Sequence, residues 1–254
     1  MLITSNDGHV RTITLNRPDA LNAFNGQQFD ELTETLLAAG SDDTVRVVIL
    51  TGAGRAFTSG LDLSEVGKDI KPPKHGVPGL FNTMIDLPKP LILAINGVGV
   101  GFGATVIGFA DIAFIAESAR LKCPFSSLGV VGEAASTYLF PRLMGSQAAA
   151  WMLYSSAWIN AQEAKNSGLV LDVFPDDVLQ NEVMNRAQTI ASNSPVALLR
   201  AKELAMGPLR EKIRATMEAE NKVYDELHGG PENMEAINAF LEKREPDFSK
   251  LGNT

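Results

Sequence analysis

Three short runs of apolar residues constrain the fold of this chain more than any other feature of its sequence. The runs are "VRVVILTG" at 45–52, "PLILAIN" at 90–96 and "DIAFIA" at 111–116. Each has the length of one strand and is followed by helical or loop segments, which is the pattern of strands buried inside a parallel sheet. The sequence therefore predicts an α/β protein.

Two features near the start extend this pattern. The segment "HVRTITL" at 9–15 alternates apolar and polar residues after the turn signal "SNDG", so we expect a hairpin there. Asn25 and Gln28 then resemble a capping box before a helical repeat of apolar residues. A hairpin followed by a helix is predicted to open the fold.

The pattern changes at about residue 195, where the apolar residues recur at helical spacing without strands. We therefore predict a core over residues 1–194 and a helical C-terminal region over 195–254. The segment "KDIKPPKHGVPG" at 68–79 carries three prolines and two glycines, which is typical of a loop.

Composition excludes several classes of function. The net charge of −8 argues against a general nucleic-acid surface, and no apolar stretch approaches the roughly 20 residues that span a bilayer. The single cysteine, Cys123, excludes an internal disulfide, and the scattered His9, His75 and His228 have no metal-ligand spacing. The first residues lack a secretory signal and the last lack a peroxisomal address, so we expect a cytoplasmic protein without a metal.

The stretch "INGVGVGFGAT" at 95–105 places a glycine at every second position from 97 to 103. Gly99, Gly101 and Ala104 satisfy a loose dinucleotide-binding pattern, but that fingerprint belongs to the first strand of its domain. Here about 90 residues with a hairpin and another buried strand precede it. Two other interpretations are close packing of a helix on a sheet and a row of exposed backbone amides.

A second segment favours the amides. "GRAFTSGLDLSEV" at 54–66 also follows a buried strand and also contains a turn of small residues. In a parallel sheet, ligands gather at the carboxyl ends of the strands, where free N–H groups point outward. Two such amides that converge on one carbonyl oxygen would form an oxyanion hole.

Four segments resemble the crotonase, or enoyl-CoA hydratase/isomerase, superfamily, in order and at the family's spacing. They are "NRPDALNAF" at 16–24, "GRAFTSGLDL" at 54–63, "INGVGVGFGAT" at 95–105 and "AQEAKNSGLVLDVFP" at 161–175. The resemblance implies a spiral of ββα units with a helical C-terminal region, and assembly as a homotrimer or a dimer of trimers. It also implies an acyl-CoA substrate, with CoA present as part of the thioester and no separate cofactor.

By position, the resemblance assigns the oxyanion amides to Leu61 and Phe102. A side chain at 102 departs from the family's usual glycine, but the donor is backbone. The residues carried over as CoA contacts are Ala20, Leu21, Ala56, Gly60, Asp62 and Leu63. Arg17 and Arg55 are each either a phosphate partner or a plain surface charge.

Hydration of an enoyl thioester in this family uses two glutamates, whose positions match Thr105 and Phe125. Neither side chain can transfer a proton at neutral pH. The segment "LKCPFSSLGVVGEAASTYLFPRLMG" at 121–145 instead resembles the Δ3,Δ2-enoyl-CoA isomerases of the peroxisomal type, whose single catalytic glutamate matches Glu133. One carboxylate suffices to move a proton from C2 to C4.

Other interpretations remain open for Glu133 and for the whole chain. A glutamate that follows a glycine and opens a helical run is often a solvent-facing carboxylate favoured by the helix dipole. The chain could also catalyse another reaction of the family on an acyl-CoA, such as hydration, or bind acyl-CoA without catalysis. The apolar residues near Glu133 favour the catalytic role, and these are Val130, Val131, Leu139 and Phe140.

Overall fold

A computed structural model describes residues 1–62 and 72–251 and contains two sheets. The larger sheet has the strand order β1-β2-β3-β5-β7-β10, in which only the β1/β2 hairpin is antiparallel among the described pairs. Its strands are β1 (Leu2–Asp7), β2 (Val10–Leu15), β3 (Val47–Gly52), β5 (Leu91–Ile95), β7 (Ile112–Ala116) and β10 (Asp172–Phe174). The three apolar runs predicted as strands are β3, β5 and β7, which lie side by side at the centre of this sheet.

The smaller sheet has the order β4-β6-β8-β9, with β9 antiparallel to β8. Its strands are β4 (Ala56–Thr58), β6 (Val98–Val100), β8 (Arg120–Lys122) and β9 (Trp158–Asn160). The chain passes from β3 to β4, from β5 to β6 and from β7 to β8, and a helix follows each of these pairs. The repeat of two strands and a helix confirms the predicted crotonase-like spiral of ββα units.

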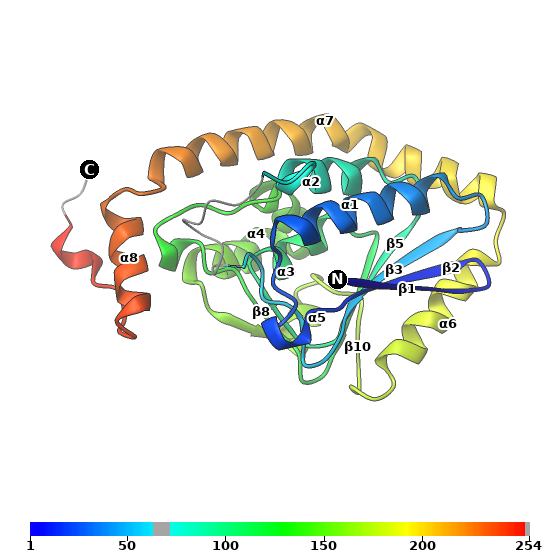
Figure 1. The fold of residues 1–254 in the computed structure, drawn as a ribbon, viewed down its shortest axis with the longest axis horizontal. Helices are drawn as coiled ribbons and strands as arrows, with labels where there is room; N and C mark the ends of the chain where they lie inside the picture. Colours follow the sequence, from blue (N-terminus) through cyan, green and yellow to red (C-terminus); the bar gives the residue numbers. More distant parts are fainter. Residues whose placement is uncertain (63–71, 252–254) are drawn as a thin grey trace.

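Helices pack on both faces of the larger sheet. The helices of the described residues are α1 (Gly26–Ser41), α2 (Gly76–Asp86), α3 (Phe102–Thr105), α4 (Ser136–Ser155), α5 (Ala161–Asn166), α6 (Leu179–Ala191), α7 (Pro195–Leu227) and α8 (Pro231–Leu241). Helix α6 packs on β2, β3, β5 and β7, while α1 and α2 lie on the opposite side (Figure 1). The long helix α7 runs past α2 along one side of the molecule, and α8 stands at its end near the C-terminus (Figure 1). The C-terminal region is therefore helical, as predicted.

A buried lysine fixes α7 against the sheet. Lys202 is 7% exposed, and its Nζ donates hydrogen bonds to the carbonyl oxygen of Lys89 at 2.7 Å and to Asp111 Oδ2 at 2.8 Å. The pKa of Lys202 is lowered because the side chain is buried, and the adjacent Asp111 carboxylate opposes part of this shift. Because a buried charge is costly unless it is paired and hydrogen-bonded, this contact specifies where α7 lies.

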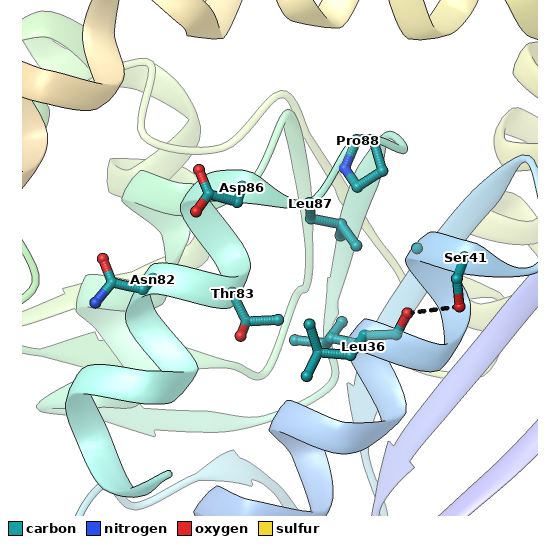
Figure 2. A pocket seen from close by; sticks show the side chains of 9 residues that line it. Leu36, Ser41, Asn82, Thr83, Asp86, Leu87 and Pro88 are labelled. Atoms are coloured by element: carbon teal, nitrogen blue, oxygen red, sulfur yellow. Dashed lines mark hydrogen bonds between the residues drawn. The ribbon is translucent and has the colours of Figure 1, made fainter.

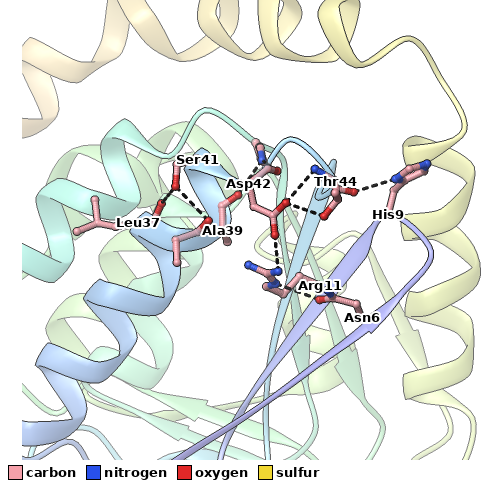
Figure 3. A network of polar contacts seen from close by, with 10 residues as sticks. Asn6, His9, Arg11, Leu37, Ala39, Ser41, Asp42 and Thr44 are labelled. Carbon is pink, nitrogen blue, oxygen red and sulfur yellow. Dashed lines mark hydrogen bonds and ion pairs between the residues drawn. The ribbon is translucent and has the colours of Figure 1, made fainter.

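A polar network ties the opening hairpin to the end of α1 (Figure 3). Arg11 donates to Asp42 Oδ2 at 2.7 Å and to Asn6, while the Thr44 hydroxyl donates to Asp42 Oδ1 at 2.6 Å. His9 Nδ1 lies 2.8 Å from the Thr44 carbonyl oxygen. The hydrogen bonds from Thr44, followed by the one from Arg11, lower the pKa of Asp42 to about 2.

Two local predictions require correction. Asn25 caps α1 by accepting a hydrogen bond from Gln28 N at 2.9 Å, but the buried Gln28 side chain has no hydrogen-bond partner among the described residues, so the reciprocal half of the capping box is not seen there. The loop predicted over 68–79 is helical from Gly76, because Asp30 of α1 accepts hydrogen bonds from the amides of Lys74, His75 and Gly76 at the start of α2. Residues 63–71 lie outside the described ranges.

Much of the apolar face of α8 is uncovered in the single chain. The residues buried from α8 are Asn233, Ala236 and Ala239, whereas its larger apolar side chains are exposed, namely Met234, Ile237, Phe240 and Leu241. Within the described ranges, no helix combines the length and apolar character that crossing a membrane requires.

Candidate active site

The turns that follow β4 and β6 meet at Gly60. A methyl group built at Gly60 would lie 2.7 Å from the Val100 carbonyl oxygen and 3.7 Å from the amide nitrogen of Phe102. Gly60 also has a φ of +87°, which strongly favours glycine. Because Gly60 has no side chain, the turn that carries Leu61 can lie against the turn that carries Phe102.

The amides of Leu61 and Phe102 donate no hydrogen bond to any described residue, although amides around them do. Gly60 N donates to Thr58 Oγ1 at 3.1 Å, and Asp62 N donates to the Phe24 carbonyl oxygen at 2.9 Å. An oxyanion hole requires free N–H groups that converge on one oxygen atom, and the turns that carry these two amides touch. The arrangement is compatible with the predicted roles of Leu61 and Phe102.

The neighbouring glycines serve close packing. A methyl group at Gly103 would lie 2.3 Å from the Thr58 carbonyl oxygen, so the start of α3 touches the end of β4. The Phe102 ring is buried and packs against Phe24 and Phe81, with ring centroids 4.9 and 5.6 Å away. Close packing and free amides thus coexist in the glycine stretch, and the ring at 102 lies in the core.

Glu133 lies on the turn between the short 3-10 helix Ser126–Leu128 and α4. It precedes the first residue of α4, Ser136, and it is only partly exposed. The alternative of a solvent-facing carboxylate in the first helical turn is therefore wrong. The next two residues, Ala134 and Ala135, have φ angles of 60° and 54°, in the left-handed region.

Burial raises the pKa of Glu133 to about 7, and the negative charge of Glu220 adds to the rise. Thr105 acts in the opposite direction, because its hydroxyl approaches the Glu133 carboxyl closely enough to lower that pKa. The approach lacks the geometry of a standard hydrogen bond, and the buried Thr105 hydroxyl has no partner of standard geometry among the described residues. A carboxyl with a pKa near 7 can both accept and return a proton at neutral pH.

Thr105 also connects the acid to the free amides. It is the last residue of α3, whose first residue is Phe102, and one helical turn rises about 5 Å. Glu133 therefore lies beside the same short helix that presents the Phe102 amide. Phe125, which the resemblance matches to the second hydratase glutamate, is buried, with 8% of its surface exposed.

Two residues of α7 that the sequence did not single out belong to this region. Glu220 is buried, and its charge raises the pKa of Glu133. Tyr224 is spaced four residues from it, on the same helical face, and the Glu133 charge raises its pKa in addition to burial. A glutamate within a long polar helix carries no local signal, so only the tertiary fold identifies Glu220.

The segments predicted to contact CoA lie side by side. The Asn22 side chain donates to the carbonyl oxygens of Ala53 and Ala56 at 2.9 and 2.8 Å, and the Thr58 hydroxyl donates back to the Asn22 carbonyl oxygen at 2.8 Å. Ser59 N also donates to the Leu21 carbonyl oxygen. Residues Ala20, Leu21, Ala56, Gly60 and Asp62 are thereby held in one region.

The two arginines differ. Arg17 forms an ion pair with Asp62 at 2.9 Å and donates to the Ala23 carbonyl oxygen at 2.6 Å, so a phosphate contact would require this pair to open. Arg55 is exposed, as a phosphate partner or a surface charge would be. Leu63 lies outside the described residues, and the CoA contacts remain predictions.

A surface pocket of about 360 Å³ lies elsewhere, between α1 and α2 (Figure 2). Its lining includes Leu36 of α1, Asn82 and Asp86 of α2, and Leu87 directly after α2 (Figure 2). None of the predicted site residues lines this pocket. Over residues 1–62 and 72–251, no group of three or more His, Cys, Asp or Glu side chains is arranged to hold a metal ion.

Comparisons with known proteins agree on one family. Residues 5–251 match the family model described as Enoyl-CoA hydratase/isomerase. The chain is 36% identical over 251 residues to enoyl-CoA delta isomerase 2 of Rattus norvegicus, an alignment that covers 96% of this chain and 64% of that protein. It is 35% identical over 249 residues to 2,3-dehydroadipyl-CoA hydratase of Escherichia coli (strain K12), with 97% and 98% covered. The solved structure of an enoyl-CoA hydratase/isomerase from Pseudoalteromonas atlantica T6c has a TM-score of 0.93 at 33% identity and covers 97% of this chain and 99% of that one.

Proposed function

Because the chain belongs to the enoyl-CoA hydratase/isomerase family, we propose that it shifts the double bond of a 3-enoyl-CoA to the 2-trans position. Glu133 acts as the only acid and base, and the amides of Leu61 and Phe102 form the oxyanion hole. CoA takes part only as the thioester of the substrate. The observation that carries the proposal is the partly buried Glu133, with a pKa of about 7, beside the helix that begins at Phe102.

The chemistry needs one group that moves one proton. The Glu133 carboxylate removes a proton from C2 of the 3-enoyl thioester, and the electron pair spreads through the C3–C4 double bond and onto the thioester oxygen. The two free amides stabilise this dienolate oxygen, at about 3 kcal/mol for each donor in measured cases. The protonated Glu133 then returns the proton at C4, and a double bond remains between C2 and C3.

The residues around Glu133 argue against a second acid. Glu220 is the nearby carboxylate, but its two oxygens accept hydrogen bonds from Ala135 N, Thr137 N and the Thr137 hydroxyl. Thr105 and Phe125 stand where the hydratase glutamates would be, and neither can activate water. The Phe125 ring also adds apolar surface where a hydratase would hold its water.

The test offers 3-hexenoyl-CoA to the purified protein and follows formation of the conjugated 2-enoyl product. We expect Glu133→Gln to lower kcat/KM about 1,000-fold or more, because a positioned acid–base group contributes about 100- to 10,000-fold and no second group replaces it. Glu117→Gln is the matched control, since Glu117 is an exposed carboxylate after β7, and it should retain the wild-type rate.

Two outcomes would replace the proposal. Fast hydration of crotonyl-CoA that is unaffected by Glu133→Gln would assign a hydratase-type reaction to the chain. If wild type and variant are both inactive while CoA esters bind, the chain is a family member that binds acyl-CoA without catalysis.

We also propose assembly as a homotrimer or a dimer of trimers in the cytoplasm. Large apolar side chains are exposed in the single chain on α4 and α8, including Trp151, Tyr154, Phe240 and Leu241. Exposed apolar surface of this kind marks interfaces. Analytical ultracentrifugation should give three or six times the chain mass of 27.2 kDa, and a stable monomer would contradict the assembly.

A further inference from the structure

Helix α4 begins without a cap of its own. Its N-cap residue is Ala135, which has no side chain to accept a hydrogen bond from the first turn. The four leading amides of a helix need partners from elsewhere, and a buried helix start without them is unfavourable. The two left-handed residues Ala134 and Ala135 make this turn still less favourable, because both carry a Cβ atom.

Glu220 supplies the missing partners from a distant part of the chain. Its Oε2 accepts a hydrogen bond from Ala135 N at 2.7 Å, and its Oε1 accepts hydrogen bonds from Thr137 N at 3.0 Å and from Thr137 Oγ1 at 2.6 Å. Glu220 is only 6% exposed, so these bonds are shielded from water. The carboxylate thus holds the start of α4 directly after Glu133, whose carbonyl oxygen in turn accepts a hydrogen bond from Ser136 N.

The same carboxylate places a negative charge near Glu133. The groups coupled to Glu133 are Glu220 and Tyr224 from α7, Cys123 after β8, and Thr105 from α3. After burial, Glu220 contributes most to the raised pKa of Glu133, and Thr105 opposes it. Burial raises the pKa of Glu220, and the three hydrogen bonds from Thr137 and Ala135 oppose that rise because they stabilise its ionised form. The ionised form of Glu220 in turn disfavours ionisation of Glu133.

We propose that Glu220 is a positioning residue for Glu133, holding the left-handed turn that carries the acid and setting a second negative charge behind it. The proposal rests on the proposed isomerase function, in which Glu133 must both remove and return a proton. Glu220 does not touch the substrate. It acts through the backbone of Ala135 and Thr137 and through its charge.

Three variants separate the two contributions of Glu220, which are its hydrogen bonds to the turn and its negative charge. Glu220→Gln removes the charge and turns an amide N–H toward a backbone N–H. Glu220→Asp keeps the charge but shortens the reach by one carbon. Glu218→Gln is the matched control, because Glu218 is an exposed carboxylate on the same helix, two residues away.

We expect Glu220→Gln and Glu220→Asp to lower kcat for 3-hexenoyl-CoA about 10- to 100-fold with little change in KM, because displacing a catalytic group by about 1 Å can cost about 100-fold. The pH at which kcat/KM is half-maximal should move to lower pH in Glu220→Gln and stay near the wild-type value in Glu220→Asp. Loss of stability with unchanged kcat and an unchanged pH midpoint would overturn the proposal, because that is the result of a structural cap alone.

A titration that does not depend on turnover separates this proposal from the proposed function. The side-chain carboxyl of Glu133 is followed by carbon NMR in protein labelled at glutamate, with the signal assigned by its loss in Glu133→Gln. A lower pKa of Glu133 in Glu220→Gln supports the proposal even if 3-hexenoyl-CoA is not converted, and an unchanged pKa contradicts it.

If Glu220→Gln does not fold, Thr137→Val tests the contact more gently. Thr137 is exposed, and the variant removes only the hydroxyl that donates to Glu220 Oε1. We expect kcat to fall about threefold with KM unchanged, because only part of the free energy of the hydrogen bond from the Thr137 hydroxyl to the Glu220 carboxylate is transmitted to Glu133. An unchanged kcat would contradict a positioning role.

Discussion

The two halves of the candidate site are built in different ways. The amides of Leu61 and Phe102 come from backbone in two turns that follow neighbouring strands, and what brings them together is the missing side chain of Gly60. The turn that carries the proposed acid, Glu133, is instead bound by a side chain from elsewhere, because Glu220 lies 85 residues from the Ala135 amide whose hydrogen bond it accepts.

Because the two halves are built differently, they should respond to different kinds of substitution. The half formed by the two amides depends on steric fit, because a side chain at Gly60 would clash with the Val100 carbonyl oxygen of the neighbouring turn. The acid half depends on charge and hydrogen bonding, which can be altered while the shape is kept. We therefore expect steric variants to act on the first half and isosteric variants to act on the second.

On the oxyanion side of the site, the largest effect is expected from Gly60→Ala. The new methyl group would lie 2.7 Å from the Val100 carbonyl oxygen at a φ of +87°, so the two turns must separate and the amides lose their alignment. We expect kcat/KM for 3-hexenoyl-CoA to fall about 100-fold or more, the loss seen when one oxyanion donor is removed.

Gly8→Ala is the control for this variant, because Gly8 also has a left-handed φ, of +55°, but no atom lies within 4 Å of the added methyl group. It should destabilise the fold by roughly 1 kcal/mol and leave the rate unchanged. If both variants lose activity equally, backbone strain rather than contact between the turns explains the effect.

A second prediction concerns the free energy of unfolding of Glu133→Gln. The pKa of Glu133 is about 7 in the folded chain, whereas a glutamate in an unfolded chain has a pKa of about 4.5. The folded chain therefore binds the proton on the Glu133 carboxyl more tightly than the unfolded chain does. This contribution to stability is fully present below pH 4.5 and is lost as the pH rises through 7. At pH 8 we therefore expect Glu133→Gln to be more stable than wild type by roughly 2–3 kcal/mol.

Urea unfolding of both proteins at pH 4.5 and pH 8 measures this difference. Near pH 4.5 the wild-type side chain is also neutral in the folded state, so the two proteins should have similar stability. If Glu133→Gln is less stable than wild type at both pH 4.5 and pH 8, the ionised Glu133 carboxylate is well solvated or paired in the folded chain.

The smallest effect is expected from Thr105→Val, a variant on the Glu133 side of the site. The Thr105 hydroxyl is buried without a hydrogen-bond partner of standard geometry among described residues, and it lowers the pKa of Glu133. Its removal should raise that pKa and reduce kcat/KM at pH 7 by less than about tenfold, while stability rises by up to about 1 kcal/mol. A pH–rate profile and thermal unfolding measure the two quantities, and a fall in both would contradict this role of Thr105.

The strand pattern and the oxyanion turns could be predicted from sequence because both are local. Apolar runs such as 47–52 are buried whatever surrounds them, and a small-residue turn after a buried strand indicates backbone amides at the edge of a sheet. The cap of Asn25 on α1 is local as well, since it spans three residues.

The features that sequence reasoning missed depend on contacts between distant segments. The sequence predicts a loop at the start of α2 because the carboxylate that caps this helix, Asp30, belongs to α1. Glu220 carries no local signal for the same reason, because it caps α4 from α7. The sequence allows Arg17 to be a phosphate partner or a surface charge, whereas its ion pair with Asp62 joins segments 45 residues apart.

The pH dependence of kcat/KM for 3-hexenoyl-CoA isomerisation tests whether Glu133 is the acid and base. A single carboxylate that must be ionised to remove the C2 proton predicts a rate that rises with pH through a midpoint near 7 and then levels off. Glu133→Gln should be slow and independent of pH over the same range. A wild-type midpoint below pH 5, or a rising limb that persists in Glu133→Gln, would contradict the assignment of Glu133 as the acid and base.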